Sequence, residues 1–278
     1  MTSKNICKFC GQEKKLIKAH IIPRNFYLDY KNEQYMEVDE LSGKFTIKQN
    51  GSYDKNILCA ECDGKILGKF DQEGYRILLD DIYKHCLYHD DKIKIYNLTS
   101  EYYDYNKFRR FFISILWKAS ISSLPEYSHI QLGEYEDKAL AILKGIASYE
   151  NLFKIYIYKY PKDKDYNKFI YITKTKIANY KTFVLNMAGY MIFIILNGKN
   201  HIYTKINHPI SKMIINNKNF CIIESEELYF QHQHMAEQKM HEMWRKGYKP
   251  PFAPKVKTKK DSFYLQKENF AISLVKSS

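Results

Sequence analysis

Four of the six cysteines in the sequence stand in two pairs of equal spacing, Cys7-x-x-Cys10 and Cys59-x-x-Cys62. Four thiolates suit the tetrahedral coordination of Zn²⁺, and a repeated Cys-x-x-Cys spacing is typical of structural zinc sites. Gly11 directly follows the first pair, where the chain has to turn so that its amides face the sulfurs. The alternative is two unrelated cysteine pairs in a reducing cytosol. The spacing favours one structural Zn²⁺ held by all four cysteines.

Two further residues near the cysteines could carry acid–base or metal chemistry. His20 lies in the run AHIIP at residues 19–23, and Asp63 directly follows Cys62. A neutral imidazole can take a proton from water near neutral pH, and a carboxylate is a hard oxygen ligand that suits Mg²⁺. The alternatives are that His20 packs or hydrogen-bonds within a hairpin, and that Asp63 complements the dipole at the N-terminus of a helix.

A zinc knuckle, a strand that ends in His-Ile-Ile-Pro and a second cysteine pair followed by a polar residue together resemble the HNH (ββα-metal, treble-clef) endonuclease family. The resemblance covers about residues 5–75. It implies that His20 is the general base, and that Asp63, at the start of the helix, holds a catalytic Mg²⁺ or Mn²⁺. Members of the family often serve in restriction and in defence against foreign DNA.

Two features depart from the pattern of that family. An Asn shortly before the second cysteine pair braces the catalytic histidine in the family, and Asn56 has this chemistry but stands closer to the cysteines. Asp54 competes for the same place, since either side chain could accept a hydrogen bond from His20. Ala19 stands where many members have a metal-binding carboxylate. The implied site therefore needs oxygen ligands from Asp54, Asp63 or a more distant acid.

The charge of the chain favours a polyanionic partner. The net charge is +13 at pH 7, and the acids in residues 150–220 are Glu150, Asp163 and Asp165, against many lysines. Cationic side chains that neutralise phosphates release condensed counterions, which drives binding to nucleic acid. We therefore expect a nucleic-acid partner, with DNA as the first choice; the alternative is a lysine face that serves solubility. The candidate phosphate contacts are Arg24, Lys257, Lys259 and Lys260.

The elements that must position these residues predict an α+β fold class. We expect an N-terminal zinc-stapled treble-clef ββα unit, then an α-helical segment, then a small antiparallel β-sheet domain. Apolar residues recur at three- and four-residue steps from Tyr105 to Ala119, which indicates a helix that Pro125 ends. Glu134–Ile146 has a second such pattern. Arg109 lies beside the first apolar stripe and is expected to face solvent.

The strand pattern has a period of two over about residues 152–224. Phe153–Tyr160 and Phe169–Lys176 are expected to form one hairpin. A second hairpin is expected from Tyr190–Leu196 and His201–Ile206, which flank the turn sequence Asn197-Gly198.

The helix of the ββα unit is expected over Cys59–Phe70, and it should be short because Gly64 and Gly68 weaken it by about 1 kcal/mol each. Two carboxylates follow, Asp71 and Glu73, and we expect both at the surface.

The chain divides into three predicted parts: an HNH-like zinc-binding ββα domain over residues 1–80, a basic α+β domain over 81–250 and a basic C-terminal tail over 251–278. The N-terminus has no apolar signal core. The longest apolar run, Phe183–Leu196, is interrupted by polar and glycine residues and is too short to span a bilayer. We therefore expect a soluble cytoplasmic protein with no membrane partner.

The function expected from these residues and from the resemblance is a divalent-metal-dependent endonuclease that hydrolyses DNA phosphodiester bonds, in restriction or anti-phage defence. The alternative is a catalytically inactive, zinc-stapled module that binds nucleic acid or another protein. The sequence leaves a protein partner and a homo-oligomer open.

Overall fold

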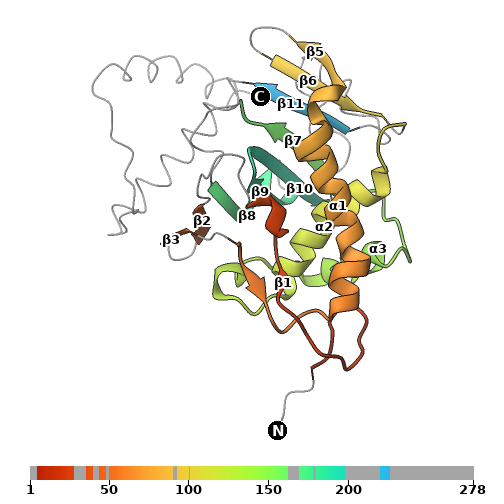
Figure 1. Ribbon diagram of the computed structural model, residues 1–278, viewed down its shortest axis with the longest axis vertical. Helices are drawn as coiled ribbons and strands as arrows, with labels where there is room; N and C mark the ends of the chain where they lie inside the picture. Colours follow the sequence, from red (N-terminus) through yellow and green to blue (C-terminus); the bar gives the residue numbers. More distant parts are fainter. Residues whose placement is uncertain are drawn as a thin grey trace.

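The protein has a mixed α+β fold, seen here in a computed structural model (Figure 1). The α+β class predicted from the sequence is confirmed at this level. The helices are α1 (Gly68–Tyr75), α2 (Tyr105–Ile121) and α3 (Glu136–Leu143). The structure describes residues 5–27, 36–39, 44–47, 50–89, 93–99, 101–161, 169–177, 180–197 and 220–225.

The described strands form two sheets. The small sheet pairs β1 (Ala19–His20) with β4 (Tyr53–Asp54) in antiparallel register. The large sheet has nine described strands in the order β3-β2-β8-β9-β10-β7-β11-β6-β5. Their bounds are β2 Met36–Asp39, β3 Lys44–Ile47, β5 Cys86–His89, β6 Ile93–Leu98, β7 Leu152–Lys159, β8 Phe169–Ile177, β9 Tyr180–Met187, β10 Tyr190–Asn197 and β11 Phe220–Ser225.

This sheet is larger and less uniform than the small antiparallel sheet that the sequence predicts. Two of its neighbour pairs are parallel, β2 with β8 and β11 with β7. Strands β2 and β3 come from the first 80 residues, and β5 and β6 come from the segment of about residues 75–150 that the sequence predicts to be helical. Burial of Ile95 and Tyr96 against the core overrides the local pattern there.

The expected hairpin between β7 and β8 is wrong. Strand β7 pairs with β10 and β11, whereas β8 pairs with β9. A two-residue turn joins β9 to β10, and both of its residues, Ala188 and Gly189, have positive φ, 48° and 79°. This left-handed geometry is that of a tight hairpin turn, which Asn-Gly usually signals and Ala-Gly does not. The second expected hairpin, beyond Asn197, lies outside the described residues.

Helix α2 is the centre of the helical layer, as the apolar pattern predicts. Asp104 caps its N-terminus by accepting a hydrogen bond from the backbone amide of Lys107 at 3.0 Å. Every residue of the helix from Phe111 to Ala119 is buried. The helix packs between α1 and α3 and contacts β7, and Figure 1 shows the three helices gathered beside the strands.

The prediction that Arg109 faces solvent is wrong. Its side chain is 6 % exposed, and its guanidinium donates to the backbone carbonyls of Ser148, Tyr149 and Leu152 at 2.7–3.0 Å. These three hydrogen bonds satisfy the buried charge and fasten α2 to the segment that leads into β7.

The helix that follows the second cysteine pair is longer than expected. It runs without a break from Ala60 to His85, with wide π-helical turns at Glu61–Leu67 and Arg76–Asp81 on either side of α1. In the first wide turn the amide of Gly68 bonds to the carbonyl of Asp63, five residues earlier. Such turns are rare and recur at functional sites.

One hydrophobic core joins both sides of the expected domain boundary at residue 80. It contains Cys7 and Phe9 of the cysteine-bearing segment, Trp117 of α2 and Ile222 of β11. The boundary therefore does not separate two cores. The predicted tail over residues 251–278 lies outside the described residues. Within the described parts of the chain, no helix has the length and apolar character needed to cross a membrane.

Candidate metal centre and histidine site

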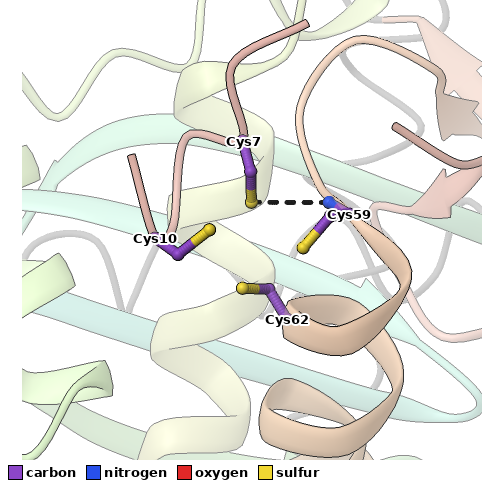
Figure 2. A group of neighbouring side chains, drawn as sticks. All are labelled: Cys7, Cys10, Cys59 and Cys62. Atoms are coloured by element: carbon purple, nitrogen blue, oxygen red, sulfur yellow. Dashed lines mark hydrogen bonds between the residues drawn. The ribbon is translucent and has the colours of Figure 1, made fainter. Parts of the chain in front are cut away.

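The four cysteines singled out in the sequence converge on one point. The Sγ atoms of Cys7, Cys10, Cys59 and Cys62 all lie within 4.8 Å of one another, and Figure 2 shows them turned toward a common centre. Cys10 is half-buried and the other three are buried. Four converging thiols of this kind could hold a metal ion such as zinc.

Two backbone segments hold the cysteines in place. Gly11 has φ +74°, and its amide bonds to the carbonyl of Cys7 at 2.8 Å, which closes the knuckle as the sequence predicts. The amides of Lys8 and Ile17 bond to the carbonyls of Ile57 and Leu58 at 2.9 Å, so that the two cysteine pairs are tied by the chain as well. The ring of Phe9, between the first two cysteines, packs edge-on against Trp117 of α2.

The backbone around Cys7 favours its thiolate. Burial alone would raise the pKa of Cys7, but hydrogen bonds from the backbone of Cys10, Cys59 and Phe9 outweigh it and lower the pKa to about 7. One of them is drawn in Figure 2, from the amide of Cys59 to Sγ of Cys7 at 3.4 Å. Amides aimed at sulfur stabilise negative charge there, and metal binding needs thiolates.

His20 ends the short strand β1, which lies between the two cysteine pairs in the sequence. It stands opposite Tyr53 of β4, and its ring packs edge-on against the Tyr53 ring with centroids 5.9 Å apart. The half-buried imidazole hydrogen-bonds to the backbone of Asn50. Burial lowers the pKa of His20, and the charge of Lys118 lowers it further, while Asp63 and the Asn50 hydrogen bond oppose the shift. A lowered pKa favours the neutral imidazole, the form that can accept a proton.

Neither residue proposed to brace this histidine does so. The carboxylate of Asp54 is directed elsewhere, to the hydroxyls of Ser122 and Ser123, and it also accepts from the backbone amides of Ser123 and Asn56. The side chain of Asn56 is exposed. The backbone of Asn50, which the sequence pattern did not single out, takes the bracing place.

Asp63, expected to bind the catalytic metal, lies in the first wide turn of the long helix and is partly buried. Burial raises the pKa of the Asp63 carboxyl, and the positive charges of Lys118 and His20 work against that rise. Asp63 therefore interacts electrostatically with His20, which lies on strand β1. The two residues that the HNH resemblance implies thus belong to one charged group.

Asp71 belongs to the same group; both it and Glu73, which the sequence predicts to lie at the surface, are half-buried. Its Oδ2 lies 4.0 Å from Nζ of Lys118, and its Oδ1 is buried with no hydrogen-bond partner among the described residues. Burial raises the pKa of Asp71, Lys118 lowers it, and the nearby charge of Asp63 raises it. Glu73 instead bonds to Arg76 and to the backbone amide of Asp104.

A pocket opens beside Asp71. Its volume is about 300 Å³, and its lining comes from the segment directly after His20 and from α1: Pro23, Asn25, Phe26, Asp71, Gln72 and Tyr75. Asp71 therefore lines a space that a small ligand, or part of a larger one, could enter.

The predicted phosphate contacts divide between described and undescribed parts of the chain. Arg24 is exposed, four residues after the end of β1, and its charge also acts on His20. Lys257, Lys259 and Lys260 lie outside the described residues.

Lys118 is the member of the group that sequence reasoning missed. It lies on α2 and is 1 % exposed. The available signal was a single lysine within the apolar run ISILWKASI at residues 113–121. A lysine in a helix that is buried on nearly all sides is costly unless it has a partner.

Comparisons of the chain with protein-family models, with curated proteins and with solved structures found no match. The function of the site is therefore inferred from its own residues.

Proposed function

We propose that the protein is a divalent-metal-dependent endonuclease that hydrolyses phosphodiester bonds, with DNA as its substrate. The observation that supports the proposal is the electrostatic interaction of the half-buried His20 with the partly buried Asp63, which directly follows Cys62 of the four converging cysteines. A base and a hard oxygen ligand are the two side chains that metal-assisted hydrolysis requires.

In the proposed reaction His20 takes a proton from the attacking water. Its half-buried ring and the hydrogen bond to Asn50 keep one nitrogen occupied and leave the other available. Asp63 and Asp71 hold a Mg²⁺ or Mn²⁺ ion, which when bound stabilises the negative charge that develops on the phosphate and on the leaving oxygen.

Asp71 is proposed to supply the carboxylate that is missing at Ala19. The family-like carboxylate is missing there, and Asp71 supplies a second acid from one helix with an oxygen that lacks a hydrogen-bond partner among the described residues. The donor atoms of His20, Asp63 and Asp71 do not converge as tightly as the cysteine sulfurs. Mg²⁺ keeps several of its bound waters in proteins, so few protein oxygens are needed to hold it.

The cysteine group has a structural part in this proposal. Zn²⁺ bound by four thiolates has no open position for a substrate, so that it would fix β1 and the start of the long helix relative to each other. Arg24 and the C-terminal lysines Lys257, Lys259 and Lys260 are proposed to contact phosphates along the DNA.

The test is a cleavage assay on plasmid, single-stranded DNA and RNA at millimolar Mg²⁺ or Mn²⁺. His20→Ala should lower the cleavage rate by about 10²–10⁴-fold because it removes the proton acceptor. Zinc content and DNA affinity should stay unchanged. Asp63→Asn should instead raise the Mg²⁺ concentration needed for half-maximal rate, because a neutral amide is a weaker ligand.

The matched control is His89→Ala, which removes an exposed histidine from β5 and should leave the rate unchanged. If the wild-type protein and His20→Ala cut equally fast, the activity is a contaminant. The chain is then better described as a zinc-stapled binding module.

A further inference from the structure

The pocket beside Asp71 lies between two elements with fixed backbones. The 3₁₀ turn Arg24–Phe26 forms one side, and the amide of Phe26 donates a hydrogen bond to the carbonyl of Pro23 at 3.0 Å. Helix α1 forms the other side, with Asp71 and Tyr75 one helical turn apart. The pocket is therefore formed before any ligand binds, as is usual for small-ligand sites.

The wall of the pocket is largely apolar and aromatic. Pro23, Phe26 and Tyr75 contribute to it. The ring of Phe26 stacks on the buried ring of Phe111 in α2, with centroids 5.3 Å apart and planes at 27°, and this contact holds Phe26 in place. The volume of about 300 Å³ is at the small end of the range for ligand pockets, so the pocket suits one planar ring system.

Of the described residues that line the pocket, Asp71 is the one with a charged side chain. Its Oδ1 is buried with no hydrogen-bond partner among the described residues, and its Oδ2 lies 4.0 Å from Nζ of Lys118, beyond the length of a hydrogen bond. The side chain is 23 % exposed, so a ligand in the pocket can reach it. Because a carboxylate accepts hydrogen bonds, the ligand has to bring donors.

The distribution of charge narrows the choice of ligand. Asn25 and Gln72, both exposed, add neutral carboxamides to the wall. A phosphate in the pocket would meet the negative charge of Asp71, and the described wall has no cation to offset it. A cationic partner is disfavoured by the net charge of +13 on the chain. A nucleobase meets all these conditions, because it is planar and neutral, carries N–H donors and is attached to a polyanion.

We propose that this pocket binds one nucleobase with an exocyclic amino group, adenine or cytosine. The amino group donates to Asp71, and the ring packs against Phe26 and Tyr75. The inference rests on the proposed function for the source of the base, a DNA strand, but binding of a free nucleoside depends on the pocket alone. A carboxylate has about four lone-pair sites, so Asp71 can accept from the base and still hold the proposed metal ion.

The pocket also specifies the class of substrate. A base can enter a pocket of this kind only when it has left the base stack, and its amino group is then free of its pairing partner. The expected substrate is therefore single-stranded DNA, or a duplex from which one base is flipped out.

The first test measures binding of free nucleosides to the full-length protein by ligand-observed NMR, without added Mg²⁺. Cytidine should bind at least about tenfold more tightly than uridine, which has a carbonyl in place of the amino donor and loses a hydrogen bond to a charged acceptor. Adenosine and inosine differ by the same exchange and should show the same preference.

Two variants with the same chemical change identify the acceptor. Asp71→Asn keeps the size of the side chain but replaces the charged acceptor by a neutral amide, so the preference for cytidine over uridine should be lost. Asp80→Asn is the matched control, because Asp80 is an exposed acid in the same helical run and does not line the pocket. Tyr75→Leu should weaken the binding of both nucleosides alike, since it removes an aromatic surface and not the acceptor.

The second test places the base in a strand. Oligothymidylate with one central deoxycytidine should bind more tightly than the same strand with deoxyuridine at that position, at one fixed salt concentration. The difference should disappear in Asp71→Asn and persist in Asp80→Asn. Fluorescence anisotropy of labelled strands measures it.

Equal affinity of the wild-type protein for cytidine and uridine, or a preference that Asp71→Asn leaves unchanged, would overturn the inference. A preference among free nucleosides that is absent in the strands would keep the pocket as a nucleobase site and count against DNA as the substrate. Cleavage of DNA that needs His20, in a protein without any base preference, would keep the proposed function and remove the inference.

Discussion

At the scale of single residues, structural and functional side chains differ in how many of their possible hydrogen bonds they form within the fold. Asp54 is a buried acid, and Asp71 is half-buried. The carboxylate of Asp54 accepts four hydrogen bonds, from Ser122, Ser123 and Asn56. Asp71 has an oxygen with no such partner in the described residues. A satisfied acid stabilises the fold, whereas an unsatisfied one has capacity left for a ligand.

Asp54 should therefore matter for stability and not for chemistry. Burial tends to raise the pKa of Asp54, but the hydrogen bonds from Ser123, Asn56 and Ser122 outweigh burial and lower it. We expect Asp54→Ala to lower the free energy of unfolding at pH 7 by about 1–3 kcal/mol, since it leaves buried donors unpaired. Denaturant unfolding monitored by circular dichroism measures the loss.

The pH dependence follows from the direction of that shift. A carboxyl whose pKa is lower in the folded than in the unfolded protein contributes stability above its unfolded pKa, which is about 3.9. The contribution declines as the pH falls below that value, and it is gone below the folded pKa. The stability difference between the wild-type protein and Asp54→Ala should therefore be constant near neutral pH and shrink below about pH 4. A difference that grows on acidification would contradict this role.

At the scale of elements, the helical run from Ala60 to His85 organises the site. It carries Cys62 of the metal centre and both proposed ligand acids, Asp63 and Asp71. It approaches α2 closely: a β-carbon built at Gly74 would lie 2.5 Å from the ring of Phe111. The glycine thus permits the contact between α1 and α2 that brings Asp71 near Lys118.

Substitution of two glycines in this run should have opposite effects. Gly74→Ala should destabilise the protein by about 1–3 kcal/mol through overpacking, although alanine has the higher helix propensity. Gly64→Ala is the matched control, because Gly64 is exposed and a β-carbon there meets nothing within 4 Å. It should stabilise by about 0.5–1 kcal/mol. Thermal unfolding of the two variants distinguishes them. Equal shifts in unfolding temperature would mean that the close approach of α1 and α2 at Gly74 does not affect stability.

At the scale of the whole molecule, the cysteine-bearing segment is part of the larger of the two hydrophobic clusters in the described residues. Phe9 packs on Trp117, and Nζ of Lys8 donates to the carbonyl of Ile121 at 2.6 Å. The cysteine cluster is thereby joined to the helical layer, which in turn contacts the large sheet through β7. If the cluster binds a metal, its loss should lower the stability of more than the first quarter of the chain.

Cys59→Ser should abolish stoichiometric zinc binding and lower the stability of the entire described fold. Structural zinc contributes about 10–16 kcal/mol in small zinc domains, as much as the whole stability of a typical domain. Metal analysis together with thermal unfolding should show zinc loss and a transition at lower temperature that includes the signal of the sheet. Cys86→Ser, at an exposed cysteine of β5, should change neither. A Cys59→Ser protein that lacks zinc but unfolds at the wild-type temperature would refute the structural role.

The sequence by itself determined the features that depend on local spacing. The cysteine spacing predicted the cluster, the apolar period predicted α2, and Gly11 predicted the left-handed knuckle. It also pointed to His20 and Asp63, whose roles stay predictions.

Only the tertiary structure decided which distant residues meet. Local patterns carry no information on strand order, so the predicted hairpin of β7 with β8 was wrong. They also could not show that Asp54 turns toward Ser122 and Ser123, or that Lys118 lies beside Asp71. Those contacts depend on how α2 packs between the other helices, and packing is a property of the whole chain.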